Sequence, residues 1–513
     1  LEGKSPRPVY IWINGERAEL RSAEHLWGLT THETDDALRR ETEDKAKTAV
    51  IGPAGEKLVR MAAIINDRDR AAGRSGVGAV LGAKNVKGIV VKGQQEVSLF
   101  NPEEFKTTNG KYRNNFKDAT KDNPPPLRLH GTAITVVGTQ SHGVFPTRNF
   151  QQGTFENWES IYGETLTKKY LVRAKPCFSC PIACGRVTKI PDGPYQGEGE
   201  GPEYETIYAL GSDCGVDDLA ALTKANYECN ELGIDTISMG STIACAMELY
   251  EKGHLTESDI GFPLEWGDGE ALVKLTRQTG MRDGFGDILA DGVKIAAQRI
   301  GSGAEEFAMH VGGQEPGLHN ALFLPSRGTG FVCDPTPGRH TAAPMARIDA
   351  GPGQYAPYPE LQIAEFDRYS YSGKGPMSAT ASQYLQVGSS AGVCIMPMMF
   401  FGNYPLVEFF NAVTGWDLDV SEVLTAGARI QTLRQCFNLR EEIPPAAVKL
   451  PDRMIGSPPQ EDGPLAGITI DVDSLAREYR QAMGWDPDSG KPEDTTLDKL
   501  GLTDLVKTFG QIQ

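Results

Sequence analysis

Short apolar runs separated by turn residues dominate the first hundred positions of the chain. The run Pro8–Ile13 is rich in β-branched and aromatic residues and ends at Asn14-Gly15, a dipeptide typical of tight hairpins. The runs 50–52 and 88–91 are interpreted as two buried strands. Because a strand pattern begins so near Leu1, we expect the chain to start inside a domain.

The pattern changes to helical spacing after Asn101-Pro102. Apolar residues recur at helical intervals from 219 to 252 with a break at Gly233, which predicts two packed helices joined by a tight turn. The segments 272–300 and 420–440 have a similar pattern. The stretch 312–358 is rich in Gly and Pro and has little periodicity, and so long an irregular stretch is usually functional.

Composition narrows the class of protein. A chain of 513 residues with 39% hydrophobic and 23% charged residues can form a large globular core. Its net charge of −17 argues against a nucleic-acid partner, because binding to phosphates relies on Lys and Arg. No apolar run is long enough to predict a membrane span. Nine cysteines are too few, and odd in number, for a disulfide framework, so we expect a reducing, cytoplasmic location.

Three of the cysteines form a C-x2-C-x3-C motif: Cys177, Cys180 and Cys184. Closely spaced thiolates favour an iron–sulfur cluster, whose fourth iron then needs a ligand from elsewhere in the chain. Radical enzymes that use S-adenosylmethionine have the reverse spacing. A zinc site and three unliganded cysteines remain the alternatives.

The other cysteines fall into two groups. Cys229, Cys245 and Cys436 lie in helical, partly apolar stretches and are predicted to be small buried hydrophobic residues. Cys394 differs, because it ends the small-residue stretch 388–394, where backbone can approach a bulky group closely. The motif predicts no role for Cys214 or Cys333.

Two Gly-rich stretches, 73–78 and 284–286, could suggest a nucleotide site. Neither has the order strand, G-x-G-x-x-G, helix, and neither is followed by the acidic residue that defines a dinucleotide site. We therefore expect any NAD to bind to another subunit.

Six segments stand out along nearly the whole chain. They are Ala71–Val80, Cys177–Arg186, Gly201–Thr206, Asn230–Thr236, Ala391–Cys394 and Met483–Asp486. Any one of them could arise by chance, but taken together and in order they resemble the tungsten-containing aldehyde:ferredoxin oxidoreductase family. The family's first domain normally begins well upstream of the position that matches Leu1.

The resemblance implies a set of cofactor ligands. Cys177, Cys180, Cys184 and Cys394 match the four ligands of one 4Fe–4S cluster, and Arg74 matches an arginine that holds a pterin. A tungsten or molybdenum ion bound by two pterins is implied, and the pattern is compatible with magnesium between the pterin phosphates. Two segments match the family's D-x-x-G-L-(C/D) pterin motifs, and their implied contacts are Asn230, Gly233, Ile234 and Asp235, and Ser389, Gly392 and Val393.

Both pterin segments depart from the family pattern at their first position. Asn230 and Ser389 stand where the family has Asp. Asn and Ser can still hydrogen-bond a pterin ring, but neither offers a carboxylate to its N–H groups.

The family's active-site acid matches Glu205, and its active-site histidine matches His340, with His319 as the alternative. The implied reaction oxidises an aldehyde to a carboxylic acid, for which a cofactor must accept the electrons. Glu205 would act as a general base, and His340 would polarise the carbonyl oxygen. Taken alone, Glu205 could be an ordinary surface or capping carboxylate, and His340 an ordinary surface histidine.

The same resemblance implies the partners and the architecture. The sequence has no second cysteine cluster, so we expect ferredoxin or an iron–sulfur partner subunit, with any flavin or NAD on a further subunit, and an oligomer. A subunit of an aromatic-acyl-CoA reductase-like complex and a non-catalytic iron–sulfur carrier are the rival functions. The predicted fold class is α+β: a β-rich pterin-binding domain (1–102), then two mainly helical domains (103–309 and 310–513).

Overall fold

The computed structural model describes residues 2–508 except 122–123, 342–344 and 401–402. The chain forms two compact units. The first contains Leu1–Glu96 and Pro126–Leu318, and the second contains Val97–Pro125 and His319–Gln513. The domain boundaries near 102 and 309 stay predictions.

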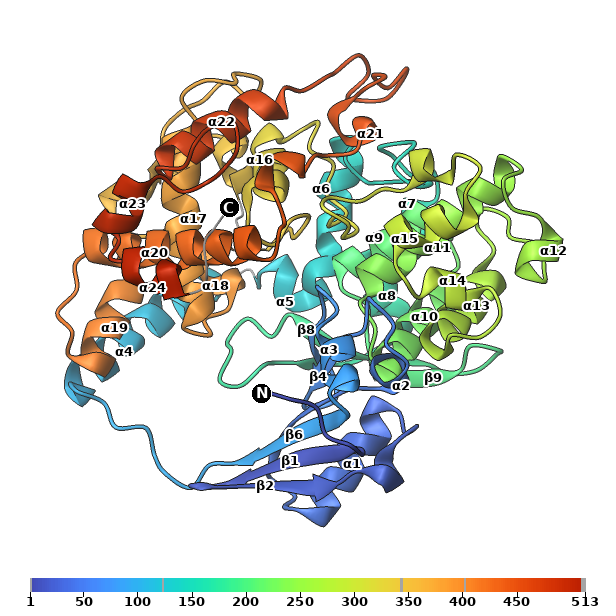
Figure 1. The fold of residues 1–513 in the computed structure, drawn as a ribbon, viewed down its shortest axis with the longest axis horizontal. Helices are drawn as coiled ribbons and strands as arrows, with labels where there is room; N and C mark the ends of the chain where they lie inside the picture. Colours follow the sequence, from blue (N-terminus) through green and yellow to red (C-terminus); the bar gives the residue numbers. More distant parts are fainter. Residues whose placement is uncertain (1, 122–123, 342–344, 401–402, 509–513) are drawn as a thin grey trace. The chain divides into compact units, whose positions relative to one another are not determined.

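The first unit begins with a six-stranded mixed sheet in the order β2-β1-β6-β3-β4-β5. The predicted hairpin is confirmed, because β1 and β2 are antiparallel on either side of Gly15, and β6 pairs in parallel with β1 (Figure 1). The predicted strand at 50–52 ends earlier, at Val50. The strands are β1 Val9–Asn14, β2 Arg17–Ser22, β3 Lys47–Val50, β4 Ile64–Asn66, β5 Arg70–Ala72 and β6 Val86–Lys92.

Alternation along β1 gives the sheet two apolar faces. Tyr10 and Trp12 pack in one cluster with Leu38 of helix α1 (Thr31–Glu41). Val9 and Ile11 point to the other face and pack with Leu81 of helix α3 (Val77–Ala83). Successive side chains of a strand point to opposite faces, so a single short strand contributes to both cores.

The remainder of the first unit is mostly helical, with one small antiparallel sheet in the order β7-β8-β9. The strands are β7 Leu171–Lys175, β8 Gly185–Ile190 and β9 Gly197–Glu200. The helices are α2 Pro53–Glu56, α5 Pro126–His130, α6 Thr135–Ser141, α7 Trp158–Ile161, α8 Gly163–Tyr170, α9 Tyr204–Leu210, α10 Leu219–Leu232, α11 Thr236–Glu251, α12 Glu257–Ile260, α13 Gly269–Met281, α14 Gly286–Leu289 and α15 Val293–Ile300.

The predicted helix pair broken at Gly233 is confirmed. Gly233 ends α10 in the left-handed conformation (φ 75°), and Asp235 caps α11 by accepting a hydrogen bond from the backbone nitrogen of Ile237. Residues 237–249 of α11 are all buried, and Gly240 lies so close to α9 that any Cβ would collide with the backbone of Ala209.

The segment 272–300 differs from its predicted pair of helices. It forms three helices, because Arg282 ends α13 in a left-handed conformation and Gly292 (φ 78°) separates α14 from α15. Arg282 adopts this conformation while its guanidinium pairs with Asp287 and Asp291.

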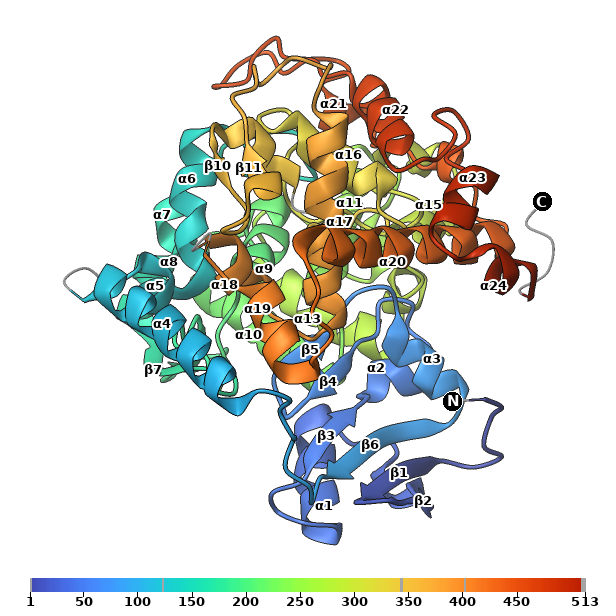
Figure 2. The same ribbon diagram turned by 90° about the vertical axis from the view of Figure 1, so that its left-hand side faces the viewer.

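The second unit is mostly helical, with one short antiparallel pair of strands, β10 (Gly353–Gln354) and β11 (Gln362–Ile363). Helix α4 lies beside α19 (Figure 2), and the rings of Phe105 and Phe409 are 5.5 Å apart. Helix α17 packs against α20 and α22. The helices are α4 Pro102–Thr120, α16 Pro325–Cys333, α17 Gly375–Ser390, α18 Ile395–Phe400, α19 Leu406–Thr414, α20 Val420–Arg440, α21 Asp452–Ile455, α22 Val472–Ala482, α23 Asp494–Lys499 and α24 Thr503–Thr508.

One prediction for the second unit was wrong. The stretch 312–358, expected to be irregular, contains helix α16. Every residue of α16 is buried, the polar Ser326, Arg327 and Thr329 included, so the helix has no exposed face and its sequence does not divide into an apolar and a polar side.

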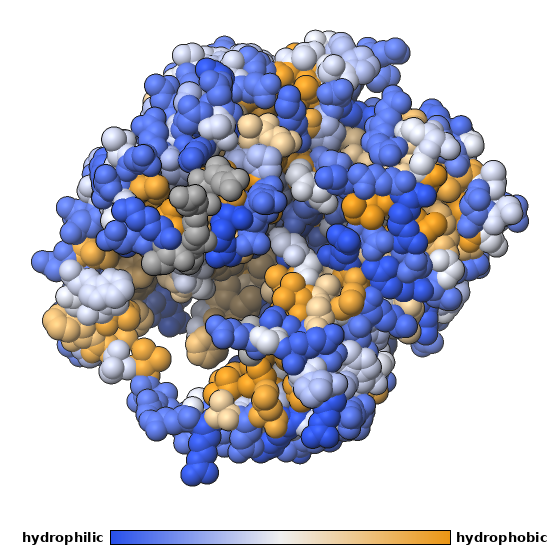
Figure 3. All heavy atoms as spheres, viewed as in Figure 1, coloured by the Kyte–Doolittle hydropathy of each residue, from blue (hydrophilic) through white to orange (hydrophobic). Residues whose placement is uncertain are grey.

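Hydrophilic side chains cover most of the face shown in Figure 3, with smaller apolar patches among them. Within the described residues, none of the helices is long and apolar enough to cross a membrane.

Candidate active site and metal centre

The three clustered cysteines lie on the loop that joins β7 to β8. The ladder between these strands ends at the pair Lys175 and Gly185, so both ends of the loop are held together beside Cys177 and Cys184. The backbone nitrogen of Cys180 donates to the Cys177 carbonyl at 3.1 Å. Cys177 is exposed, and the other two cysteines are half-buried. This loop, residues 176–184, is called the cluster loop below.

Arg186 fixes the far end of the cluster loop. Its Nη2 donates to the Cys184 carbonyl at 3.0 Å and lies 3.4 Å from Glu203 Oε2, and its Nη1 donates to the His130 carbonyl. The guanidinium fills the space where a Cβ on Gly131 would stand. A buried, multiply bonded arginine makes the loop a defined structure.

Arg74, the predicted pterin-binding arginine, forms an ion pair with the predicted pterin-binding segment 230–235. Its Nε lies 3.1 Å from Asp235 Oδ2 in a pair that is 9% and 7% exposed, and its Nη2 donates to the Glu315 carbonyl. The same Asp235 carboxylate accepts a hydrogen bond from the Ser238 hydroxyl at 2.8 Å. The structure therefore brings Arg74 and Asp235 together.

The turn that contains Asn230, Gly233 and Ile234 packs on the first sheet's loops. The Gly233 carbonyl accepts from the Ala63 nitrogen at 2.8 Å, and the Asn230 carbonyl accepts from the Thr31 hydroxyl at 2.7 Å. Ile234 is buried, and a Cβ on Gly233 would stand 2.9 Å from the Gly52 nitrogen. Close backbone approach at this turn requires glycine.

Glu205 lies in the first turn of α9 and is 5% exposed. Its Oε2 accepts a hydrogen bond from the backbone nitrogen of Leu318 at 2.8 Å. The neighbouring Tyr204 and Tyr208 rings meet edge to face at 5.4 Å. The sequence alone would allow a surface carboxylate, but the structure buries it.

The two alternative histidines lie side by side in the second unit. The ring centroids of His319 and His340 are 5.6 Å apart, and both residues are half-buried. The His340 carbonyl accepts from Arg327 Nη1 at 2.6 Å. From the sequence, His319 and His340 were alternatives for one position, whereas in the structure the two rings lie next to each other.

Ser389 lies in the last turn of α17, and Gly392, Val393 and Cys394 lie in the turn that follows this helix. Gly392 has φ 75°, and the backbone nitrogen of Val393 donates to the Gly388 carbonyl at 2.9 Å. Cys394 is exposed, and among the described residues, apart from the two chain neighbours of Gly392, no atom lies within 4 Å of where a Cβ on Gly392 would stand. Close approach of the backbone to a bulky group at this turn stays a prediction, and so does the turn's role in holding the cluster.

The remaining cysteines are buried. This confirms the prediction for Cys229, Cys245 and Cys436, and Cys214 and Cys333 are buried as well. Burial raises the pKa of the Cys436 thiol to about 11 and that of Cys333 to about 12. Thiols held protonated in this way are poor metal ligands.

The residues of the cluster loop fit an iron–sulfur cluster. Three thiols lie on one short loop, and Arg70 stands close enough to interact electrostatically with Cys177 and Cys184. Sequence analysis missed Arg70 and its partners; the alternating Asp-Arg-Asp-Arg run at 67–70 was the available signal.

Among the described residues, no three His, Cys, Asp or Glu side chains are arranged to hold a single metal ion.

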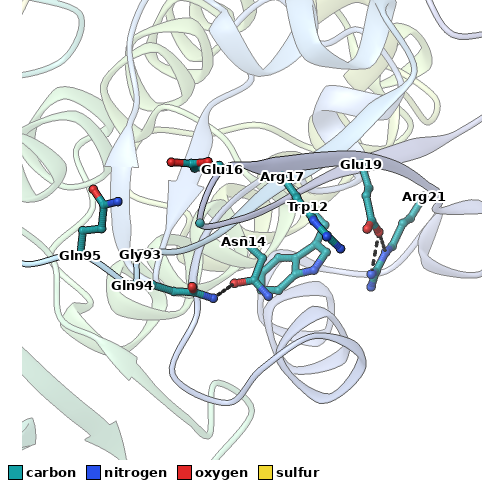
Figure 4. A pocket seen from close by; sticks show the side chains of 10 residues that line it. Trp12, Asn14, Glu16, Arg17, Glu19, Arg21, Gly93, Gln94 and Gln95 are labelled. Carbon is teal, nitrogen blue, oxygen red and sulfur yellow. Dashed lines mark hydrogen bonds and ion pairs between the residues drawn. The ribbon is translucent and has the colours of Figure 1, made fainter.

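A separate open cavity of about 720 Å³ lies on the β1–β2 hairpin (Figure 4). Asn14 and Gln94 are hydrogen-bonded at 2.7 Å beside it, and Arg21 pairs with Glu19 at 2.8 Å. It is lined by none of the predicted site residues.

Two family models match most of this chain. A family model described as aldehyde ferredoxin oxidoreductase, domains 2 and 3, matches residues 110–502, and one described as its N-terminal domain matches residues 1–93. The chain belongs to the aldehyde ferredoxin oxidoreductase family. The predicted resemblance and the α+β fold class are therefore confirmed.

Relatives in this family are similar along nearly the whole chain. The tungsten-containing aldehyde ferredoxin oxidoreductase of Pyrococcus furiosus is 37% identical over 98% of this chain and 82% of its own length. That of Thermococcus kodakarensis is 36% identical over 99% and 82%. A solved structure, the active-site complex BamBC of benzoyl coenzyme A reductase with 1,5-dienoyl-CoA, is similar with TM-score 0.79 and 25% identity, covering 99% of this chain and 81% of that one.

Proposed function

We propose that this chain is the catalytic subunit of a tungsten-pterin oxidoreductase that oxidises aldehydes to carboxylic acids. The electrons leave through one 4Fe–4S cluster to ferredoxin or an iron–sulfur partner subunit. The observation that supports this most directly is the buried Glu205 carboxylate, anchored to the backbone of Leu318 one residue before His319.

Each cofactor has candidate residues. Cys177, Cys180, Cys184 and Cys394 would hold the cluster, and the pterins would be held by Arg74 and the turns at 230–235 and 389–393. When bound, the bis-pterin tungsten (or molybdenum) centre supplies the two-electron redox chemistry that no side chain can perform. A magnesium ion between the pterin phosphates stays a prediction.

The protein's own groups handle protons and orientation. An aldehyde and a water give a carboxylic acid, two electrons and two protons. Glu205 accepts a proton from that water, because its Oε2 is fixed by Leu318 and its surroundings exclude bulk solvent. The paired imidazoles of His319 and His340 orient the aldehyde by donating a hydrogen bond to its oxygen.

The electron acceptor approaches the cluster loop. Phe178, next to Cys177, is 97% exposed. Lys168, Lys169 and Arg173, all exposed, precede the loop on α8 and the edge strand β7. These three exposed cations, close to the loop in the sequence of a chain of net charge −17, favour an acidic iron–sulfur protein as the partner.

Anaerobic turnover tests the proposal. Purified holoenzyme is given benzaldehyde and oxidised benzyl viologen in water enriched with heavy oxygen. We expect benzoate carrying one heavy oxygen atom from water and two reduced viologens per benzoate. Because the similarity to the benzoyl coenzyme A reductase complex favours a second candidate, benzoyl-CoA is assayed as well with reduced viologen. Its reduction without aldehyde oxidation would contradict the proposal.

A further inference from the structure

Beside the cluster loop lies a network of six alternating charges, all in the first unit. The cations are His32, Lys175 and Arg70, and the carboxylates are Glu231, Asp69 and Glu200. They come from α1, α10, β7, β9, the β4–β5 turn and the first residue of β5, which is Arg70. The proposed reaction uses none of them.

The carboxylates in the middle of this network are buried. Glu200 is 6% exposed and lies 2.8 Å from Arg70 Nη1 and 3.2 Å from Lys175 Nζ. Asp69 is 9% exposed, pairs with Lys175 and lies 3.3 Å from His32 Nε2. Charges this well enclosed interact more strongly than surface pairs do.

The Arg70 end of the network faces the cysteines. Burial alone would lower the pKa of the Arg70 guanidinium, but the charges of Glu200, Cys177, Glu203 and Cys184 outweigh burial and raise that pKa. Arg70 Nη2 also donates to the Lys175 carbonyl at 3.1 Å, at the start of the cluster loop. Arg70 is therefore a cation of this network that lies against the end of the loop at Lys175 and interacts electrostatically with Cys177 and Cys184.

Packing holds the guanidinium in this place. Gly185 follows Cys184, and a Cβ there would collide with Arg70 Nη2 and stand 2.8 Å from Glu200 Oε1. The Glu200 carbonyl in turn accepts a hydrogen bond from the Asn226 amide of α10 at 2.8 Å. Because Gly185 has no side chain, the Arg70–Glu200 pair can lie directly against the loop.

We propose that Arg70, positioned by Glu200, sets the reduction potential of the cluster bound on this loop. Reduction adds one negative charge to the cluster, and a fixed neighbouring cation stabilises the reduced form. Glu200 partly neutralises that cation, so the two residues act in opposite directions. This inference rests on the proposed function, since it requires the cluster.

Redox titration of the anaerobic holoenzyme, followed by the electron paramagnetic resonance signal of the reduced cluster, tests this inference. In Arg70→Met we expect the ratio of reduced to oxidised cluster at a fixed potential to fall about tenfold, which is about 59 mV for a one-electron couple. Glu200→Gln should shift the ratio the opposite way. Arg70→Lys, which keeps the charge, should stay near wild type.

Arg68→Met is the matched control, because Arg68 lies two residues away in an exposed pair with Asp36 and its removal changes the net charge equally. We expect no shift there. A ratio in Arg70→Met equal to that in Arg68→Met would overturn the inference. If Arg70→Met loses its iron, an unshifted ratio in Glu200→Gln would overturn it instead. A wild-type protein with no reducible cluster would refute the proposed function itself, which is a different result.

Discussion

Glu205 Oε2 accepts a hydrogen bond from the Leu318 backbone nitrogen at 2.8 Å, and Leu318 immediately precedes His319. The contact joins residues 113 positions apart in the sequence. It fixes one oxygen of a buried carboxylate in place, which is what a general base needs in order to meet its proton in a defined geometry.

Glu205→Gln should abolish most of the activity without loss of cofactor. The amide keeps the size of the side chain and its oxygen can still accept from Leu318, but it cannot take a proton. We expect kcat for aldehyde oxidation to fall by about 10²–10⁴-fold, with iron and tungsten contents unchanged. Glu198→Gln, at a half-exposed surface position, is the control. A Glu205→Gln enzyme within twofold of wild type would disprove the role.

His319 and His340 should behave as a unit. Their ring centroids are 5.6 Å apart, so replacing either histidine also disturbs the ring of the other. We expect the loss of kcat/KM in the double variant to be smaller than the product of the two single losses. Steady-state kinetics measure this, with the exposed His25→Asn as control. Strictly multiplicative losses would show that the two rings act independently.

His32 should make the protein's stability depend on pH. Burial alone would lower the pKa of His32, but Asp69 and Glu231 raise it from 6.5 to about 9. Because the pKa of His32 is higher in the folded protein than in the unfolded chain, the protonated imidazole stabilises the fold. This stabilisation is fully present below about pH 6.5 and is lost as the pH rises through about 9. The pKa difference corresponds to on the order of 3 kcal/mol.

The measurement compares thermal unfolding midpoints of wild type and His32→Asn between about pH 6 and about pH 10. We expect a large difference at the acidic end that shrinks towards the alkaline end. A difference that is constant with pH would mean that folding leaves the pKa of His32 unchanged, which would contradict the raised pKa.

Gly240→Ala should destabilise the first unit, because its Cβ would collide with the backbone of Ala209 in α9. We expect a loss of about 1–3 kcal/mol in the free energy of unfolding. Gly138→Ala is the matched control: Gly138 lies in α6 with no atom near the new methyl group, and the substitution should gain about 0.4–1 kcal/mol. Equal melting temperatures for the two variants would contradict the close packing of α9 on α11.

The sequence predicted those elements that are determined by a few neighbouring residues. The hairpin at Asn14-Gly15 and the helix pair broken at Gly233 depend on turn residues that the sequence displays directly. Helix α16 was missed, because it is buried on all sides and its polar residues do not mark a solvent-facing side.

The site was predictable only where a motif marks it. The three cysteines stand within eight residues of one another and are readily recognised. The pairing of Arg74 with Asp235 spans 161 positions, and that of Lys175 with Asp69 spans 106. No local pattern shows which charges meet across such separations, so the network beside the cluster loop became visible only in the fold.

Metal analysis tests the central claim most directly. Iron, tungsten and zinc are measured in anaerobically purified wild type, Cys180→Ser, Cys394→Ser and Cys436→Ser, with the buried Cys436 as control. We predict about four irons and about one tungsten per chain in wild type and in Cys436→Ser, with iron lost in the other two variants. Zinc without iron in wild type, or a full complement of iron in Cys394→Ser, would contradict the account.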